Sequence, residues 1–183
     1  MSNGYQYRGC FKDDKFHGMA SLLISQGVIF QGEFDNGYCG SIGKLLYPDG
    51  DIYFGQHKLF VKDGVGKMVY INGSIYEGRW ESDRKNYEGR MQYKETGDVY
   101  VGEFHEGKRS GNGRYYQSSD HTIYEGEWTN DRKQGEGKIL HADGVIASGD
   151  FRADQMEGKL TYLRTLPKQD VERVFNLIRF HRD

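Results

Sequence analysis

The chain has 183 residues, of which only 36% are hydrophobic although 14% are aromatic. Glycine occurs 26 times, about twice the average usage, and proline occurs twice, which excludes a collagen-like or a proline-rich disordered chain. The net charge of −2 argues against bulk electrostatic attraction to nucleic acid or anionic lipid, so no nucleic-acid partner is expected.

Residues 1–6 are predicted to be a short lead-in. They contain neither the charged nor the apolar region of a secretory signal, and no run of about 18 apolar residues predicts a membrane span. Cys10 and Cys39 occupy different positions of the repeat described next, so no disulfide framework is predicted. We therefore expect a cytoplasmic protein in a reducing compartment.

A unit of 23 or 24 residues recurs along the chain. It starts with an aromatic residue, followed by glycine two residues later and a second aromatic residue after two more, as in Tyr76-Glu-Gly78-Arg-Trp80. Neighbouring units start 23, 23, 23, 24, 24 and 23 residues apart, and the third position is glycine in every unit. A fixed period of this kind predicts a repeat architecture. The seven repeats are predicted at 7–29, 30–52, 53–75, 76–99, 100–123, 124–146 and 147–164.

Each repeat is predicted to be a β-hairpin. Its first strand covers about five residues, in which the aromatic and glycine positions alternate with polar ones. Its second strand covers the fourteenth to the eighteenth positions. Turn sequences such as Asp49-Gly50 and Asn72-Gly73 lead into the next repeat, and Asn36-Gly37 indicates a similar reversal within a repeat.

The later repeats depart from this scheme in a few places. His57 takes the second aromatic position of the third repeat. The fourth and fifth repeats each gain one loop residue, and the fifth has no turn glycine. The seventh starts with Ala147 in place of an aromatic residue, so the ring column is predicted to weaken there.

Glycine at the third and fourteenth positions is predicted to leave bare backbone beneath neighbouring rings. A single-layer sheet has no second layer to pack against, and each large ring buries roughly 150–250 Å². Glycine within a strand often marks such a close approach. We expect ring packing to outweigh the entropic cost of roughly 0.5–1 kcal/mol per glycine.

The last segment, 165–183, is predicted to be an amphipathic helix. Thr165 is a candidate N-cap and Pro167 suits the first turn. The first interpretation is a cap that covers the open strand edge at the end of the array, and the alternative is a docking helix for a partner. The apolar stripe of this helix consists of Val171, Val174, Phe175 and Ile178.

The fifteenth position is basic in five consecutive repeats. Acidic residues are predicted on the same polar face, so the first interpretation is cross-strand charge pairing on a solvated surface. The alternative is a phosphate- or lipid-binding ladder. Its basic residues are Lys44, Lys67, Arg90, Arg114 and Lys138.

Catalytic motifs are absent from the sequence. The six histidines occupy unrelated repeat positions, and no phosphate-binding loop, H-E-x-x-H or G-x-S-x-G pattern occurs. We therefore expect no enzymatic activity, no cofactor and no metal site.

The unit Y-x-G-x-W/F resembles the MORN repeat (membrane occupation and recognition nexus), most closely at Tyr76, Tyr100 and Tyr124. The resemblance covers about residues 7–164. It implies an all-β fold, an elongated single-layer antiparallel sheet of consecutive hairpins with an aromatic groove. It also implies a non-catalytic scaffold in cytoskeletal, ciliary, flagellar or membrane-adjacent assemblies.

We therefore predict a scaffold that binds a helix or an extended peptide of a protein partner along the aromatic groove, since aromatic residues are enriched in binding hot spots. The alternative is a membrane-associated phosphoinositide-binding module that uses the basic ladder. Homo-oligomerisation is left open. A second candidate surface is the apolar column Leu23, Leu46, Val69, Tyr116, Leu140 and Leu163. The predicted groove residues are Phe34, Tyr47, Tyr70, Tyr76, Trp80, Tyr93, Tyr100, Phe104, Tyr124 and Trp128.

Overall fold

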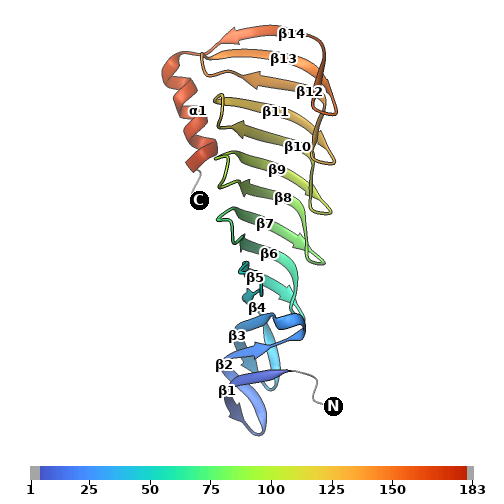
Figure 1. The fold of residues 1–183 in the computed structure, drawn as a ribbon, viewed down its shortest axis with the longest axis vertical. Helices are drawn as coiled ribbons and strands as arrows, with labels where there is room; N and C mark the ends of the chain where they lie inside the picture. The colour runs from blue at the N-terminus through green and yellow to red at the C-terminus, as the bar shows by residue number, and fades with distance from the viewer. Residues whose placement is uncertain (1–4, 181–183) are drawn as a thin grey trace. The chain divides into compact units, whose positions relative to one another are not determined.

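The computed structural model describes residues 5–180 (Figure 1). The parts of the predicted lead-in and C-terminal segment at 1–4 and 181–183 lie outside the described residues. The chain divides into two units, 1–84 and 85–183. In each unit every strand pairs antiparallel with its neighbours in sequence, which confirms the predicted single layer of consecutive hairpins.

Between residues 5 and 84, the first unit contains seven strands and a single 3₁₀ turn at Ser25–Gly27. Its strands are β1 (Gln6–Lys12), β2 (Lys15–Leu23), β3 (Ile29–Asp35), β4 (Tyr38–Leu46), β5 (Ile52–Lys58), β6 (Val61–Val69) and β7 (Ile75–Glu81).

The second unit contains seven strands, the first of which begins at the boundary, and the predicted C-terminal helix. These elements are β8 (Arg84–Gln92), β9 (Val99–His105), β10 (Lys108–Gln117), β11 (Thr122–Thr129), β12 (Arg132–Leu140), β13 (Val145–Arg152), β14 (Gln155–Thr165) and α1 (Lys168–Phe180).

The turn inside each hairpin consists of two residues with positive φ. Asn130 and Asp131 have φ values of 51° and 69°, which matches the type I′ turn whose twist fits antiparallel strands. Asparagine, aspartate and glycine adopt this conformation at the lowest cost. Leu59 and Phe60 adopt it too, at 47° and 71°, although their side chains disfavour it.

In the first six repeats, the first aromatic ring lies forward along its own strand, over glycine. The Tyr53 hydroxyl donates a 2.6 Å hydrogen bond to the Gln56 carbonyl, three residues on. A Cβ atom at Gly55 would lie 2.7 Å from the same hydroxyl, and one at Gly66 would meet the ring. The predicted stacking of rings on bare backbone is therefore confirmed at this repeat. The same hydroxyl-to-carbonyl bond joins Tyr7 to Cys10, Tyr76 to Arg79, Tyr100 to Glu103 and Tyr124 to Glu127.

The second aromatic residue of a repeat, or His57 in the third repeat, packs against these rings. In the second unit, the Trp128 ring meets Tyr100 and Tyr124 edge-on, with centroid separations of 5.4 Å in both pairs. Its indole N–H donates to the Gly113 carbonyl at 3.3 Å. We call the side of each unit that carries these rings the ring face, and the opposite side the outer face. Edge-to-face ring pairs of this kind contribute more stability than the area that they bury would account for.

The C-terminal helix lies against the outer face of the second unit, and this corrects the expected position. We predicted that it would cover the open edge, but its apolar stripe packs on a row contributed by several strands. Figure 1 shows it running past the ends of several strands of the second unit rather than along the last strand, β14. Ile178 and Val171 are buried, and Val174 and Phe175 are partly buried. Burial of that apolar row outweighs coverage of backbone groups at an edge. The row consists of Val99, Tyr116, Ile123 and Leu140.

Polar contacts hold both ends of α1. The Leu166 N–H donates to the Gly144 carbonyl at 2.8 Å, just before the helix. The Arg90 guanidinium donates to the carbonyls of Ile178 and Arg179 at 3.4 and 3.0 Å, near its end. A cation at this end also complements the helix dipole.

Prediction for glycine packing. Gly43→Ala and Gly40→Ala change the same strand, but only the first places a methyl group against a ring. A Cβ at Gly43 would lie 2.7 Å from the Phe30 Cζ, whereas one at Gly40 meets nothing closer than 3.5 Å. Gly43→Ala should lower the free energy of unfolding by about 1–3 kcal/mol, and Gly40→Ala should change it by less than about 0.5 kcal/mol. Urea denaturation measures both, and equal effects would contradict ring-on-glycine packing.

Candidate functional site

The rings predicted to line a groove are mostly core residues. Tyr47, Tyr70 and Tyr93 are half-buried, and the other seven are buried, so a partner cannot reach those seven while the covering side chains stay in place. The seven buried rings therefore do not line an open groove. The buried members are Phe34, Tyr76, Trp80, Tyr100, Phe104, Tyr124 and Trp128.

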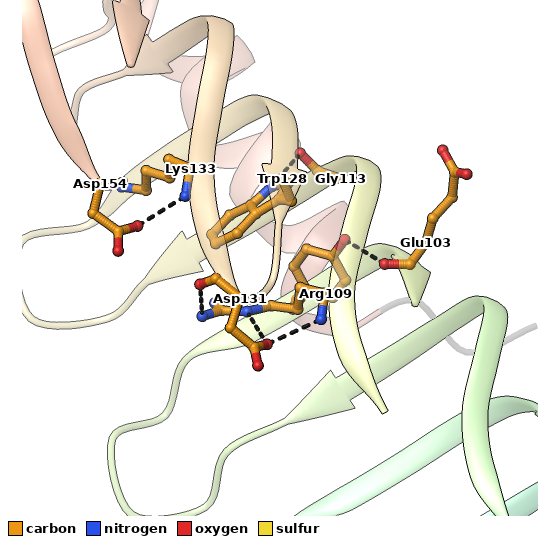
Figure 2. Close-up of polar contacts among 8 residues, drawn as sticks. Glu103, Arg109, Gly113, Trp128, Asp131, Lys133 and Asp154 are labelled. Atoms are coloured by element: carbon orange, nitrogen blue, oxygen red, sulfur yellow. Dashed lines mark hydrogen bonds and ion pairs between the residues drawn. The ribbon is translucent and has the colours of Figure 1, made fainter. Parts of the chain in front are cut away.

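A column of cations covers these rings, and the sequence analysis missed it. Its members occupy the tenth position of four consecutive repeats. In the second unit, the Arg109 Cζ lies 4.3 Å from the centroid of Trp128 (Figure 2). It lies 5.2 Å from the centroid of Tyr115. Such cation–π contacts strengthen when they are shielded from water. We call Lys62, Lys85, Arg109 and Lys133 the cation column.

Aspartates in the neighbouring hairpin turns hold three members of the column, Lys62, Arg109 and Lys133, in place. The Asp131 carboxylate accepts from the Arg109 main-chain N–H at 2.9 Å and pairs with its guanidinium at 3.2 Å, while the guanidinium also donates to the Asp131 carbonyl at 2.7 Å (Figure 2). The Asp154 carboxylate likewise accepts a hydrogen bond from the Lys133 main-chain N–H, at 2.9 Å. The sequence signal for these three was an aspartate at the eighth position of the following repeat, where Lys85 is instead followed by Gly107.

The same arrangement occurs in the first unit around Lys62. Its ammonium lies 4.9 Å from the Tyr47 ring centroid and 5.1 Å from that of Trp80. It also donates to the Tyr47 hydroxyl at 3.0 Å and pairs with Asp83 at 3.2 Å. The cation therefore closes the ring face from solvent.

Burial dominates the electrostatics of the ring face. It lowers the pKa of Lys85 and of Lys133, and the carboxylates of Asp131 and Asp154, respectively, partly oppose this effect. Burial also raises the pKa of the Tyr53, Tyr76, Tyr100 and Tyr124 hydroxyls, to about 12 for Tyr124. These hydroxyls therefore stay protonated near neutral pH, as suits a structural core.

The predicted phosphate or lipid ladder is largely engaged within the chain. Lys67 pairs with Glu77 at 2.6 Å, and Arg114 pairs with Glu125 at 3.0 Å. Arg90 holds the end of α1, and the Lys44 ammonium lies 5.2 Å from the Phe54 ring centroid. The last member, Lys138, lines the hollow described next.

The outer face of the second unit is hollowed into a groove of about 770 Å³. Its floor includes backbone left bare by glycine, at Gly113, Gly126 and Gly137. Both positively and negatively charged side chains line its sides. We call this hollow the polar groove. The charged residues that line it are Arg114, Glu125, Glu127, Glu136, Lys138, Asp150 and Lys159.

An apolar pocket of about 510 Å³ adjoins the polar groove beside α1. The two hollows share Arg114, Glu125 and Lys138. Leu163 and Leu177 are 46% and 54% exposed at the pocket, although both are apolar. An apolar anchor beside a polar track suits a bound peptide segment. The apolar lining consists of Ile123, Leu140, Ile146, Leu163, Leu166, Val174, Leu177 and Ile178.

Between residues 5 and 180, no three histidine, cysteine or acidic side chains lie together in a way that could hold a metal ion. Over the same range, the structure contains no helix with the length and apolar character needed to cross a bilayer.

A family model described as MORN repeat matches residues 7–27, 30–52, 61–75, 100–122 and 124–146. Comparison with curated protein sequences finds no match.

Two solved structures share the fold at low sequence identity. The TCP10 domain of Danio rerio CPAP, in complex with a peptide of STIL, is 14% identical with a TM-score of 0.53, over 90% of this chain and 69% of that one. The TCP domain of Drosophila melanogaster SAS-4 (dCPAP), in complex with a proline-rich motif of Ana2, is 13% identical with a TM-score of 0.50, over 84% and 90%.

Prediction for His57. This side chain is 4% exposed, and its Nε2 has no partner among the described groups, while burial lowers its pKa. Its contribution to stability is therefore present above the unfolded pKa of about 6.5 and is lost as pH falls through the lower folded value. We expect stability to fall between pH 7.5 and pH 5, and His57→Phe to reduce that fall.

Urea midpoints at the two pH values measure this effect. His105→Gln is the control, because His105 is exposed. If wild type and His57→Phe lose stability equally, the pH dependence has another origin.

Prediction for the cation column. Arg109→Ala removes an ion pair and the cover of Trp128, so the free energy of unfolding should fall by about 2–4 kcal/mol. The tryptophan emission should shift to longer wavelength. Arg109→Lys should retain most of the stability, since lysine occupies this position in three other repeats. Arg132→Ala is the control, because Arg132 is exposed. If Arg132→Ala lowers stability as much as Arg109→Ala does, the cation column has no special role in stability.

Proposed function

Because the chain belongs to the MORN-repeat family, we propose that it is a non-catalytic scaffold that binds a segment of a partner protein in the polar groove and apolar pocket of the second unit. The observation that carries this proposal is the adjoining of the two hollows on one face. The pocket takes an apolar side chain as an anchor, and the groove takes the main chain and charged side chains that follow it.

The groove favours an extended segment. Its lining residues come from strands β9–β14, and neighbouring strands lie about 4.8 Å apart, so a segment crossing them covers roughly 24 Å. An extended chain of about seven or eight residues has this length. Bare glycine backbone on the floor allows a close approach, and the mixed charges select among segments.

Peptide complexes of the same fold support this reading. The two TCP domains compared above hold a peptide of STIL and a proline-rich motif of Ana2, and we propose a ligand of similar, extended kind here. Proline-rich segments are already extended, so they lose little entropy on binding. We further propose that the partner belongs to a cytoskeletal or ciliary assembly, as the family resemblance implies.

The half-buried rings are a second candidate position for the same partner. Tyr47, Tyr70 and Tyr93 retain some exposure beside the cation column. Their edges offer contact area at low entropic cost. Tyr93→Ala therefore serves as the variant that reports on the ring face.

Phospholipid binding is the less favoured alternative. The carboxylates of Glu77 and Glu125 already neutralise Lys67 and Arg114, and a lipid phosphate would have to displace them. Surface pairs of this kind are weak, so the comparison with vesicles is worth making directly.

Prediction for the proposed function. We expect displayed cytoskeletal protein segments to bind the full chain, and Leu163→Glu or Lys138→Glu to weaken the best of them at least tenfold, because both residues line the hollows. Lys44→Glu changes the same repeat position in the first unit and should leave affinity within about twofold. Fluorescence anisotropy with the selected synthetic peptides measures each affinity.

Three results would count against the groove. These are no selective segment, segments indifferent to both groove variants, or segments lost with Tyr93→Ala alone, which would assign binding to the ring face. Flotation with phosphoinositide vesicles that is abolished by Lys44→Glu, Lys67→Glu and Arg90→Glu together would favour the lipid alternative.

A further inference from the structure

We propose that the outer face of the first unit is a separate docking surface, whose occupant is an amphipathic helix of a partner protein lying across strands β2–β7. This surface is distinct from the polar groove of the second unit, and the proposal does not depend on a ligand in that groove.

A row of aliphatic side chains crosses the outer face of the first unit. Consecutive members are paired in register, as in Leu23 with Ile29 and Leu46 with Ile52. Ile29 is 37% exposed and the other members are half-buried. We call this set the aliphatic row. It consists of Leu23, Ile29, Leu46, Ile52, Val69 and Ile75.

The second unit shows what covers such a row. Val99, Tyr116, Ile123 and Leu140 pair in the same repeat register and are 1–8% exposed, because α1 packs on them. Between residues 5 and 84, the only helical segment is the short turn Ser25–Gly27. The first unit therefore presents the row without the helix that buries its counterpart.

The residues beside the row are also more apolar in the first unit than in the second. At the thirteenth position of the first three repeats, Met19, Ile42 and Val65 are 73%, 64% and 58% exposed. The corresponding residues of repeats four to six are Glu88, Asn112 and Glu136. Phe54, beside the aliphatic row, is another 44% exposed. Exposed apolar residues gathered on one face mark an interaction surface.

The spacing of the row fits a helix. Neighbouring strands lie about 4.8 Å apart and a helix rises about 5.4 Å per turn, so a helix crossing the strands places about one apolar side chain on each. In α1 these side chains are Val171, Val174, Phe175 and Ile178, at the i, i+3, i+4 and i+7 positions. The aliphatic row crosses six strands, or about 24 Å, which corresponds to a helix of about 16 residues.

Charge sets the direction of the docked helix. Arg90, at the fifteenth repeat position, donates to the last carbonyls of α1. Lys44 occupies the same position in the first unit, on the strand that carries Leu46, whereas Lys67 is paired with Glu77. Lys44 favours the negative end of a helix dipole and acidic residues in the last turn of the helix.

Prediction for the docking helix. The probe is a synthetic peptide of residues 165–180 of this chain, labelled with a fluorophore and added to the full-length protein, whose own helix occupies the second unit. We expect saturable binding by fluorescence anisotropy. Ile29→Glu together with Phe54→Glu should weaken it at least tenfold, because both side chains are exposed on the proposed surface.

Ile71→Glu is the matched control, because Ile71 is 73% exposed but lies in a loop, and it should change affinity by less than twofold. Circular dichroism establishes that each variant is folded, and Val65→Glu replaces the pair if the double variant is not. The proposal is overturned by three outcomes. These are no saturable binding, binding unchanged by the outer-face variants, or a wild-type dimer in sedimentation that the same variants dissociate, which would make the occupant a second copy.

Discussion

The packing of aromatic rings on bare glycine backbone is the interaction on which the fold depends. A single sheet layer has no second layer to bury its side chains. The tyrosine that starts a repeat therefore lies along its own strand, and its hydroxyl donates a hydrogen bond to the carbonyl three residues on. Tryptophan and phenylalanine then close the gaps between successive rings. Glycine at these positions costs backbone entropy, and the buried rings offset that cost.

This core also decides where a partner can bind. Because rings and cation column together close the ring face, the hollows of the second unit lie on the outer face. There the glycines that receive rings on one side leave accessible backbone on the other. A single substitution at such a glycine therefore affects both stability and the floor of the groove.

The two units use the same register in different ways. The second unit covers its apolar row with α1, and its neighbouring outer positions are polar or charged. The first unit leaves the equivalent row partly exposed, beside Met19, Ile42 and Val65. A repeat protein can thus present different surfaces without changing its backbone, because each repeat contacts mainly its neighbours.

The period of aromatic and glycine residues was enough, without coordinates, to predict the hairpins, their antiparallel order, the stacking of rings on glycine and the C-terminal helix. These features depend on local contacts within a repeat or between adjacent repeats, which recur in the sequence. Only the tertiary structure decided that Trp80 and Trp128 are buried, because their cover comes from Lys62 and Arg109 of the preceding repeats. It also placed α1 on the outer face, since that position depends on apolar residues brought together from several strands.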